Sequence, residues 1–350
     1  MFTVDKTKRP LHRSHTKKSP ANETDPNDQR IAGNSPSNRN SSAMDSLSPP
    51  QEPYRNWVEL PRDVTASILW KLGAIEILTS AQLVCSTWRS ICKDPSMWRS
   101  IDMHNLGDLW DMDYDLGRMC RHAVDRSSGG LVDVNIEYFG TDDLLQYIAD
   151  RSSHLKRLRL VCCYSISDEG LSEVATKFPL LEELDISYCS LSKQALEVVG
   201  RCCPLLKSFK LNNQGCRNPH IECNEEALAI AEHMPHLRYL QIFGNKLTNE
   251  GLQAILDGCP HLESLDLRQC FNVNMDGHLG KRCIERIKDL RHPYDPTDDY
   301  PFDAEIADVG SSEEDYPSGF SEIDFLSDDD DYYEFSGGSD MSDFEHLYFD

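Results

Sequence analysis

The stretch GCPHLESLDLRQC, residues 258–270, spaces Leu262, Leu265 and Leu267 by three and two positions and ends on Cys270. The same pattern, L-x-x-L-x-L-x-x-[NC] with occasional Ile, recurs at intervals of 24 to 31 residues, which is typical of a stacked repeat array. Clear copies are Leu155/Leu158/Leu160/Cys163, Leu181/Leu184/Ile186/Cys189 and Leu237/Leu240/Ile242/Asn245; weaker copies begin at Leu131, at Leu206 and, at the front, at Trp98.

Each copy is followed by a second signature, a helix-capping residue with a leucine four places later. The capping residues are Thr141, Ser167, Ser192, Asn224 and Thr248. Ser, Thr and Asn side chains accept hydrogen bonds from the free N–H groups at a helix start. Each repeat is therefore predicted to be a short strand, a turn and a helix. Stacked repeats of this kind make an α/β solenoid over residues 98–292, with parallel strands on the concave face and helices on the convex face.

The charge is unevenly distributed along the 350 residues. The net charge is −24, but the 58 residues after His292 hold 20 Asp or Glu and no Lys or Arg. Residues 293–350 are therefore predicted to be a disordered acidic tail, and residues 1–53, rich in Ser, Pro, Asn and Lys, a disordered and mildly basic one. The nearly balanced middle of the chain gives no basic face for nucleic acid. No apolar run approaches the length of a membrane span.

The 13 cysteines are odd in number and include two adjacent pairs, so they do not suggest a disulfide framework. We expect reduced thiols, and a nuclear or cytoplasmic location. Cys163, Cys189 and Cys270 occupy the slot where strand turns toward helix, where a small buried residue fits, and no His stands at a fixed offset to activate them. No metal motif or catalytic motif is present, and we expect neither a cofactor nor an enzyme.

Residues 54–97 change to helical periodicity. Val64, Ile68 and Leu72 fall on one face, at steps of four, and Gly73 separates a first helix from a second. A second apolar face is formed by Leu78, Ala81, Val84, Cys85, Trp88 and Ile91. Three short helices cannot hide all of this apolar surface internally, so a partner protein is expected to cover the remainder.

The segment LPRDVTASILWKLGAIEILTSAQLVCSTWRSICKDPSMW, residues 60–98, resembles an F-box, and the array resembles the cysteine-containing class of leucine-rich repeats. The likeness is closest to plant F-box/leucine-rich-repeat proteins of the Skp-interacting kind and covers about residues 57–291. One departure is Gly73, where the family often has proline. The resemblance implies an adaptor-binding set, for the interface or the helical core beneath it, made of Leu60, Pro61, Ile68, Leu69, Leu72, Val84 and Trp88.

The resemblance also implies a function. The chain would be the substrate-recognition subunit of a Skp–cullin–F-box ubiquitin ligase, joining a Skp adaptor, and through it a cullin, to a target protein for ubiquitination and proteasomal degradation. The alternative is a non-degradative repeat scaffold that binds the adaptor without substrate turnover.

Strand positions that face the concave surface are the candidates for substrate contact. Across neighbouring strands their charges alternate in sign, which also allows the simpler interpretation that lateral pairs neutralise one another. Two exposed aromatics in this set favour a partner. The predicted substrate-binding residues are Arg157, Arg159, Lys210, Tyr239, Phe243 and Arg268.

Overall fold

The computed structural model describes residues 60–105, 114–217, 221–302, 304 and 306. The predicted tail over residues 1–53, and residues 307–350 of the acidic tail, lie outside this part of the chain. All described residues belong to one compact unit.

Residues 61–98 form short helices joined by tight turns. Pro61 precedes the first helix with an extended backbone, and Gly73 adopts a φ of +81°, which separates α1 from α2 as the sequence predicts. Cys85, also extended, starts the last α-helix of this group. Its elements are α1 (Arg62–Trp70), α2 (Gly73–Glu76), a π-helical turn (Ile77–Ala81), α3 (Gln82–Val84), α4 (Ser86–Cys92) and a 3-10 turn (Pro95–Trp98).

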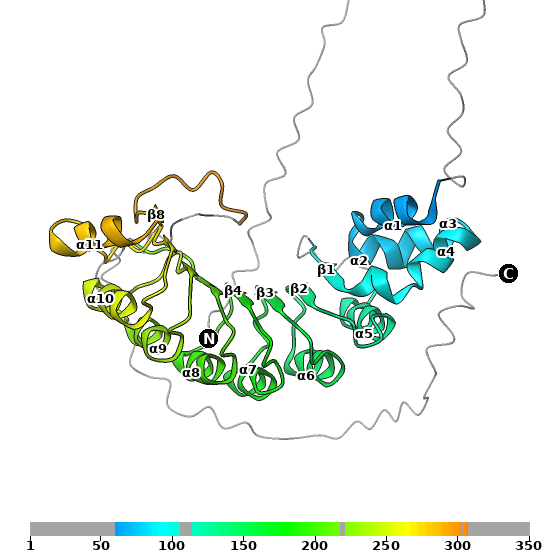
Figure 1. Cartoon of the computed structure of the whole chain (residues 1–350), viewed down its shortest axis with the longest axis horizontal. Helices are drawn as coiled ribbons and strands as arrows, with labels where there is room; N and C mark the ends of the chain where they lie inside the picture. Colours follow the sequence, from blue (N-terminus) through cyan, green and yellow to red (C-terminus); the bar gives the residue numbers. More distant parts are fainter. Residues whose placement is uncertain (1–59, 106–113, 218–220, 303, 305, 307–350) are drawn as a thin grey trace, which may run out of the picture. The chain divides into compact units, whose positions relative to one another are not determined.

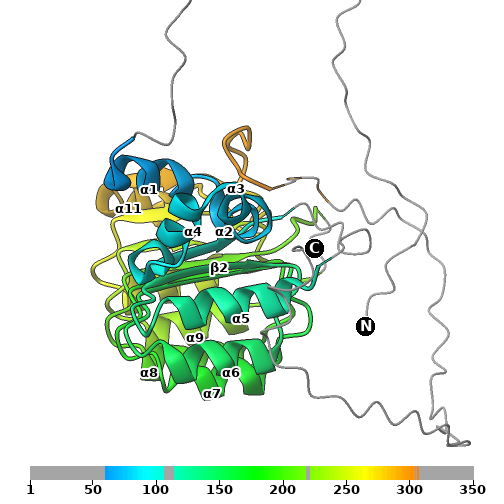
Figure 2. The same ribbon diagram turned by 90° about the vertical axis from the view of Figure 1, so that its right-hand side faces the viewer.

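The sheet contains eight parallel strands that pair in chain order. Figure 1 shows the helices of the array along the outer side of the strands, and Figure 2 shows the same two layers from the end of the array. The strands are β1 (Ser100–Met103), β2 (Asp133–Glu137), β3 (Arg157–Val161), β4 (Glu183–Ser187), β5 (Ser208–Asn212), β6 (Tyr239–Gln241), β7 (Ser264–Asp266) and β8 (Asp289–Arg291). The helices between them are α5 (Leu116–Arg126), α6 (Asp142–Arg151), α7 (Asp168–Ala175), α8 (Lys193–Cys202), α9 (Glu225–His233), α10 (Asn249–Gly258) and α11 (His278–Arg286).

The core consists of the template residues. In the copy at residues 155–163, Leu155, Leu158, Leu160 and Cys163 are all buried, and equivalent residues stack from repeat to repeat. Register is kept from strand to strand, so that Leu158 pairs with Val134 on one side and with Leu184 on the other. The predicted fold, helices of an F-box kind followed by a solenoid of parallel strands and outer helices, is confirmed.

The predicted caps form at four of the five helices. The side chains of Thr141, Ser167, Ser192 and Thr248 each accept from a backbone N–H in the first turn of the helix that follows. The prediction is wrong for Asn224, which makes no cap bond to α9. Its amide oxygen instead accepts from the backbone N–H of Thr248 in the next repeat, at 2.8 Å.

The same link joins other neighbouring repeats. Asp142 accepts from the backbone N–H of Ser167 at 2.9 Å and from its hydroxyl at 2.7 Å. Asp168 makes the equivalent pair of bonds to Ser192. The capping residues and the acids beside them therefore tie one repeat to the next as well as starting a helix.

The far end of the array differs from the expected boundary. β8 adds one more strand than the template copies indicated, and α11 begins at Gly277 without a side-chain cap, in keeping with a terminal repeat. Residues 292–302, which we call the return segment, run back from β8 over the sheet, where Tyr300 is buried. The expectation of disorder from residue 293 onward therefore does not describe this part of the chain.

Candidate interaction surfaces

The first surface is an apolar one on the F-box helices. Six large apolar side chains there are exposed by 37 to 62 %, although their neighbours are packed in the core. They are Val64, Ile68, Trp70, Leu72, Leu83 and Val84. Val64, Ile68 and Leu72 are the face that the four-residue spacing predicted, and the structure leaves that face uncovered.

The predicted adaptor-binding residues divide between this surface and the core. Pro61, Ile68, Leu72 and Val84 are exposed, and Leu60 and Trp88 are half-buried. Leu69 is wholly buried against the helices behind it, so its placement on the adaptor-facing surface is wrong. Trp70 and Leu83 are exposed apolar residues that the sequence analysis did not select.

Below these helices, Trp98 joins the F-box to the array. Its indole N–H donates to the carbonyl of Cys92 at 2.7 Å, and the guanidinium of Arg126, on α5, lies 5.5 Å from its ring. Because Trp98 is almost completely buried, the F-box helices and the first repeat share one core. Whatever binds the F-box is therefore held at a fixed position relative to the start of the sheet.

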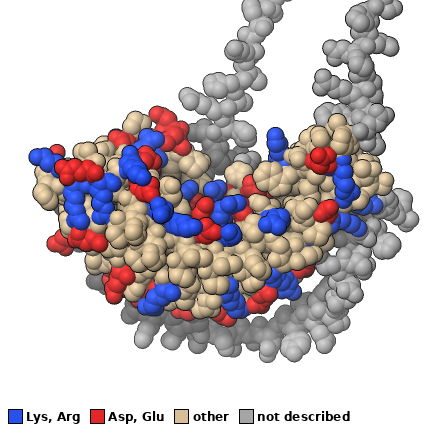
Figure 3. Space-filling model, viewed as in Figure 1, with Lys and Arg blue, Asp and Glu red and all other residues tan. Residues whose placement is uncertain are grey.

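The second surface is the concave face of the sheet, where charges alternate between strands. Arg157 pairs with Asp133 at 2.8 Å, and Asp185 lies between Arg159 and Lys210, at 3.3 and 3.4 Å. Figure 3 shows the two signs interspersed over the drawn face. These pairs support the interpretation that lateral neighbours neutralise one another, while Arg157, Arg159 and Lys210 remain partly exposed.

A polar hollow of about 630 Å³ lies where this face meets the F-box. Trp70, Lys71 and Trp98 line it from the F-box side, and Arg157, Asp185 and other strand residues line it from the sheet. The residues that line it come from both halves of the chain, so a bound protein could touch both.

The two predicted aromatic contacts differ in exposure. Tyr239 on β6 is half exposed, as expected. Phe243 has no exposed surface, because Tyr300 of the return segment stacks on it with ring centroids 3.9 Å apart and planes 3° apart. The expectation that Phe243 is exposed is therefore wrong; a segment 57 residues later in the chain covers it.

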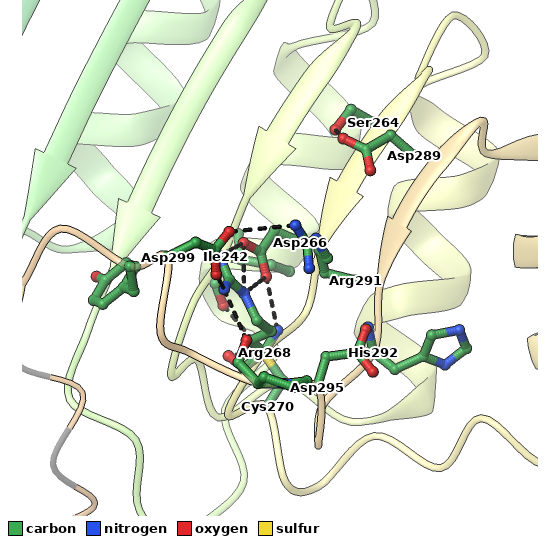
Figure 4. Close-up of polar contacts among 12 residues, drawn as sticks. Ile242, Ser264, Asp266, Arg268, Cys270, Asp289, Arg291, His292, Asp295 and Asp299 are labelled. Carbon is green, nitrogen blue, oxygen red and sulfur yellow. Dashed lines mark hydrogen bonds and ion pairs between the residues drawn. The ribbon is translucent and has the colours of Figure 1, made fainter.

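Arg268 is also enclosed rather than displayed. Figure 4 shows its guanidinium with the carboxylates of Asp266 and Asp299, and its side chain is only 6 % exposed. Asp266 binds it at 2.7 Å through one nitrogen and at 3.0 Å through another. These hydrogen bonds raise the pKa of Arg268, which stays charged at any pH of interest.

The template cysteines hold structural positions. The thiol of Cys270 donates to the carbonyl of Ile242 in the preceding repeat at 2.9 Å, and Cys163 makes a longer contact with Ile136. Burial raises the pKa of the Cys270 thiol well above its usual range. A thiol held protonated against a carbonyl is a poor nucleophile.

Two further properties concern the described residues as a group. Among them, no three His, Cys, Asp or Glu side chains are placed together to hold a metal ion. Every helix in the same part of the chain is too short or too polar to cross a membrane.

Comparison with known protein families matches both halves of the chain. The F-box-like family matches residues 57–104, the repeats described as "FBD-associated F-box protein At5g56370, LRR repeats" match residues 118–228, and a leucine-rich-repeat family matches residues 233–256. An F-box with an exposed apolar face, followed by a repeat sheet, defines the class. The chain belongs to the F-box/leucine-rich-repeat family.

Particular relatives come from Arabidopsis thaliana. The chain is 58 % identical to F-box protein SKIP19 over 297 residues, which is 84 % of this chain and 94 % of that protein. It is 31 % identical to F-box protein FBW2 over 68 % of this chain and 74 % of the relative. It is 30 % identical to F-box protein SKIP1 over 73 % and 92 %.

Proposed function

We propose that this chain is the substrate receptor of a Skp–cullin–F-box ubiquitin ligase. The observation that carries the proposal is the exposed apolar row Val64, Ile68 and Leu72, on an F-box whose remaining apolar side chains are buried. Relatives named SKIP19 and SKIP1, Skp-interacting F-box proteins, support an adaptor of the Skp family as the partner that covers this row.

The energetics are adequate for a stable complex. A large apolar side chain contributes about 1.5 to 3 kcal/mol when it passes from full exposure to full burial. The six exposed side chains start about half exposed, so their gross contribution is about 5 to 9 kcal/mol before association costs are subtracted. Side-chain ordering costs are small, because these residues lie on a packed helical scaffold.

The mechanism requires positioning but no catalytic group in this chain. The adaptor and cullin would hold a loaded ubiquitin-conjugating enzyme, and the concave sheet would hold the target. Tethering the target lysine near the thioester raises the effective concentration of the two reactants. The shared core around Trp98 supports this role, because it fixes the F-box relative to the sheet.

The adaptor interface is tested with Val84→Asp, which places a charge where burial is proposed. Val84 is 62 % exposed, so the variant should fold normally. Binding of the full chain to a purified Skp adaptor should weaken at least 10-fold, because the charge would be desolvated in the complex. The matched control is Leu228→Asp, an equally drastic change at an exposed residue of α9. Equal binding by the two variants would contradict the proposed interface.

Receptor and scaffold are distinguished by protein turnover. Proteins captured by the full chain with the proteasome inhibited should include at least one whose half-life lengthens when this chain is removed from cells. If every captured protein keeps its half-life, the degradative role fails and the non-degradative scaffold remains.

A further inference from the structure

The return segment crosses the carboxyl ends of strands β7, β6 and β4. The backbone N–H of Gln269, after β7, donates to the carbonyl of Pro293 at 2.8 Å, and its side-chain amide donates to the carbonyl of Ala304 at 2.7 Å. The segment contains a single turn closed by Tyr300 N–H and Thr297, and it has no helix or strand of its own. Its attachment to the sheet is therefore mainly through side chains.

Tyr300 is the apolar anchor. Besides stacking on Phe243, it receives a hydrogen bond from the hydroxyl of Tyr188, which follows β4, at 3.3 Å. Phe302 packs edge-on against the ring of Tyr188 with centroids 5.8 Å apart. Tyr300 is 7 % exposed, whereas Tyr294 in the same segment is 75 % exposed. One tyrosine of this segment is thus inserted and another is left in solvent.

Asp299 is the charged anchor, directly before the inserted tyrosine. Its carboxylate binds Arg268 through one oxygen and Arg291 through the other, at 3.3 Å for the second pair. Arg268 also donates to the carbonyl of Pro296 at 3.0 Å. An acidic residue followed by tyrosine is therefore recognised by two arginines and an aromatic face together.

The parts that recognise this pair all belong to the sheet. Phe243 and Tyr188 are fixed by the repeats, and Asp266 holds the guanidinium of Arg268 in place independently of Asp299. We propose that Tyr188, Phe243, Arg268 and Arg291 form a peptide-recognition slot for an acidic residue followed by tyrosine, and that the return segment occupies this slot in competition with client proteins that carry the same pair. This deepens the proposed function by naming the client's chemistry, and it rests on that function only for the consequence of binding.

The slot selects tyrosine without a phosphate. Two nearly buried carboxylates, Asp185 and Asp266, lie near the inserted hydroxyl, and together with burial and Tyr188 they raise the pKa of Tyr300. A phosphate at this hydroxyl would face the same two negative charges and would be repelled. Phosphorylation of the client tyrosine would therefore block binding.

Competition within the chain follows from the short connection. Only eight positions separate Arg291, the last residue of β8, from Asp299, so the local concentration of the return segment is about millimolar or higher. A client must exceed this concentration or bind better. The sequence repeats Asp-Tyr-Pro at residues 315–317, outside the described part of the chain, which gives a second segment with the same chemistry.

The test uses the full chain and a labelled peptide, YDPTDDYPF, which copies residues 294–302. The emptied variant carries Asp299→Ala and Tyr300→Ala, and the matched control carries Tyr294→Ala and Asp298→Ala, two exposed residues of the same segment. The emptied variant should bind the peptide at least 10-fold more tightly than the wild type and the control. The peptide with alanine or phosphotyrosine in place of the second tyrosine should bind at least 10-fold more weakly. Equal affinity of the three proteins, or of the three peptides, would overturn the proposal.

A second measurement covers the case in which the emptied variant does not fold. In the wild-type chain, millimolar peptide should speed hydrogen exchange at the amide of Tyr300, since the peptide displaces the segment that protects it. Unchanged exchange at saturating peptide overturns the proposal in the unmodified protein. Adaptor binding by the same samples is measured in parallel: normal adaptor binding without peptide binding refutes the slot alone, and the reverse refutes the adaptor assignment alone.

Discussion

At the scale of single residues, a recurring side chain links neighbouring repeats at the start of each helix. Asp142, Asp168, Asn224 and Asn249 each accept a backbone N–H from the following repeat, at 2.8 to 2.9 Å. In a solenoid each repeat contacts only its neighbours, so stability depends on such interfaces as much as on the repeats themselves. A short polar side chain at this position therefore contributes to the interface between repeats.

Asp168→Ala tests this link. The substitution removes the acceptor for both the N–H and the hydroxyl of Ser192, and we expect a loss of about 1 to 2 kcal/mol in the free energy of unfolding. Urea denaturation followed by circular dichroism gives the value. The control is Asp150→Ala, which removes an exposed carboxylate paired with Lys177 and should cost clearly less. If the two variants lose equal stability, the link between the repeats contributes nothing specific.

The residue scale also shows where sequence-based prediction ends. Adjacent residues Ile68 and Leu69 are both apolar and both fit the F-box pattern, yet one is exposed and the other buried, because only the packing of α1 on its neighbours decides which face turns inward. Asn224 fits a cap by type and position, but the next repeat competes for its amide. Neither outcome is encoded in residue type alone.

At the scale of elements, the outer helices approach each other closely enough to require glycine. A Cβ on Gly258, the last residue of α10, would lie 2.1 Å from the carbonyl oxygen of Ala231 in α9. Backbone atoms of a packed helix cannot yield as a side chain can, so this glycine sets the spacing of the two helices.

Gly258→Ala should therefore destabilise the chain, although alanine normally favours a helix by about 1 kcal/mol over glycine. We expect a loss of about 1 to 3 kcal/mol from the forced separation of α9 and α10. Gly117→Ala in α5 is the matched control, because its Cβ would meet only the side chain of Asp115 at 3.1 Å. Melting temperatures measured by calorimetry should fall for the first variant and hold or rise for the second. A rise for both would contradict the steric account.

The elements of the array were largely predictable because a fixed period encodes them. Leu155, Leu158 and Leu160 mark strand β3 and its turn, and the register of Arg157 with Asp133 follows from aligning the templates. The return segment has no such period. Its acids and prolines suggest a solvated tail, and only the three-dimensional placement of Phe243 shows that Tyr300 has a complementary surface.

At the scale of the whole molecule, two charge triads join successive repeats where the strands begin. Glu182 binds Lys156 and Lys207, each at 2.9 Å, and Glu263 binds Arg238 and Lys288 in the same arrangement. Each triad spans three repeats. The two basic partners lower the pKa of Glu182 to about 2 and also lower the pKa of Glu263.

These lowered pKa values predict how the stability of the array depends on pH. In the unfolded chain a glutamate takes up its proton near pH 4.3, whereas folded Glu182 stays ionised until about pH 2. The stabilisation by the triads is therefore complete above about pH 4.5 and is lost as the pH falls toward 2. Melting temperatures measured between pH 6 and pH 2.5 should decline, and the double variant Glu182→Gln, Glu263→Gln should decline less steeply from a lower starting value. Glu169→Gln, which removes one negative charge from an exposed position in α7, should leave the slope unchanged. Identical slopes for the double variant and the wild type would show that the triads do not couple the repeats.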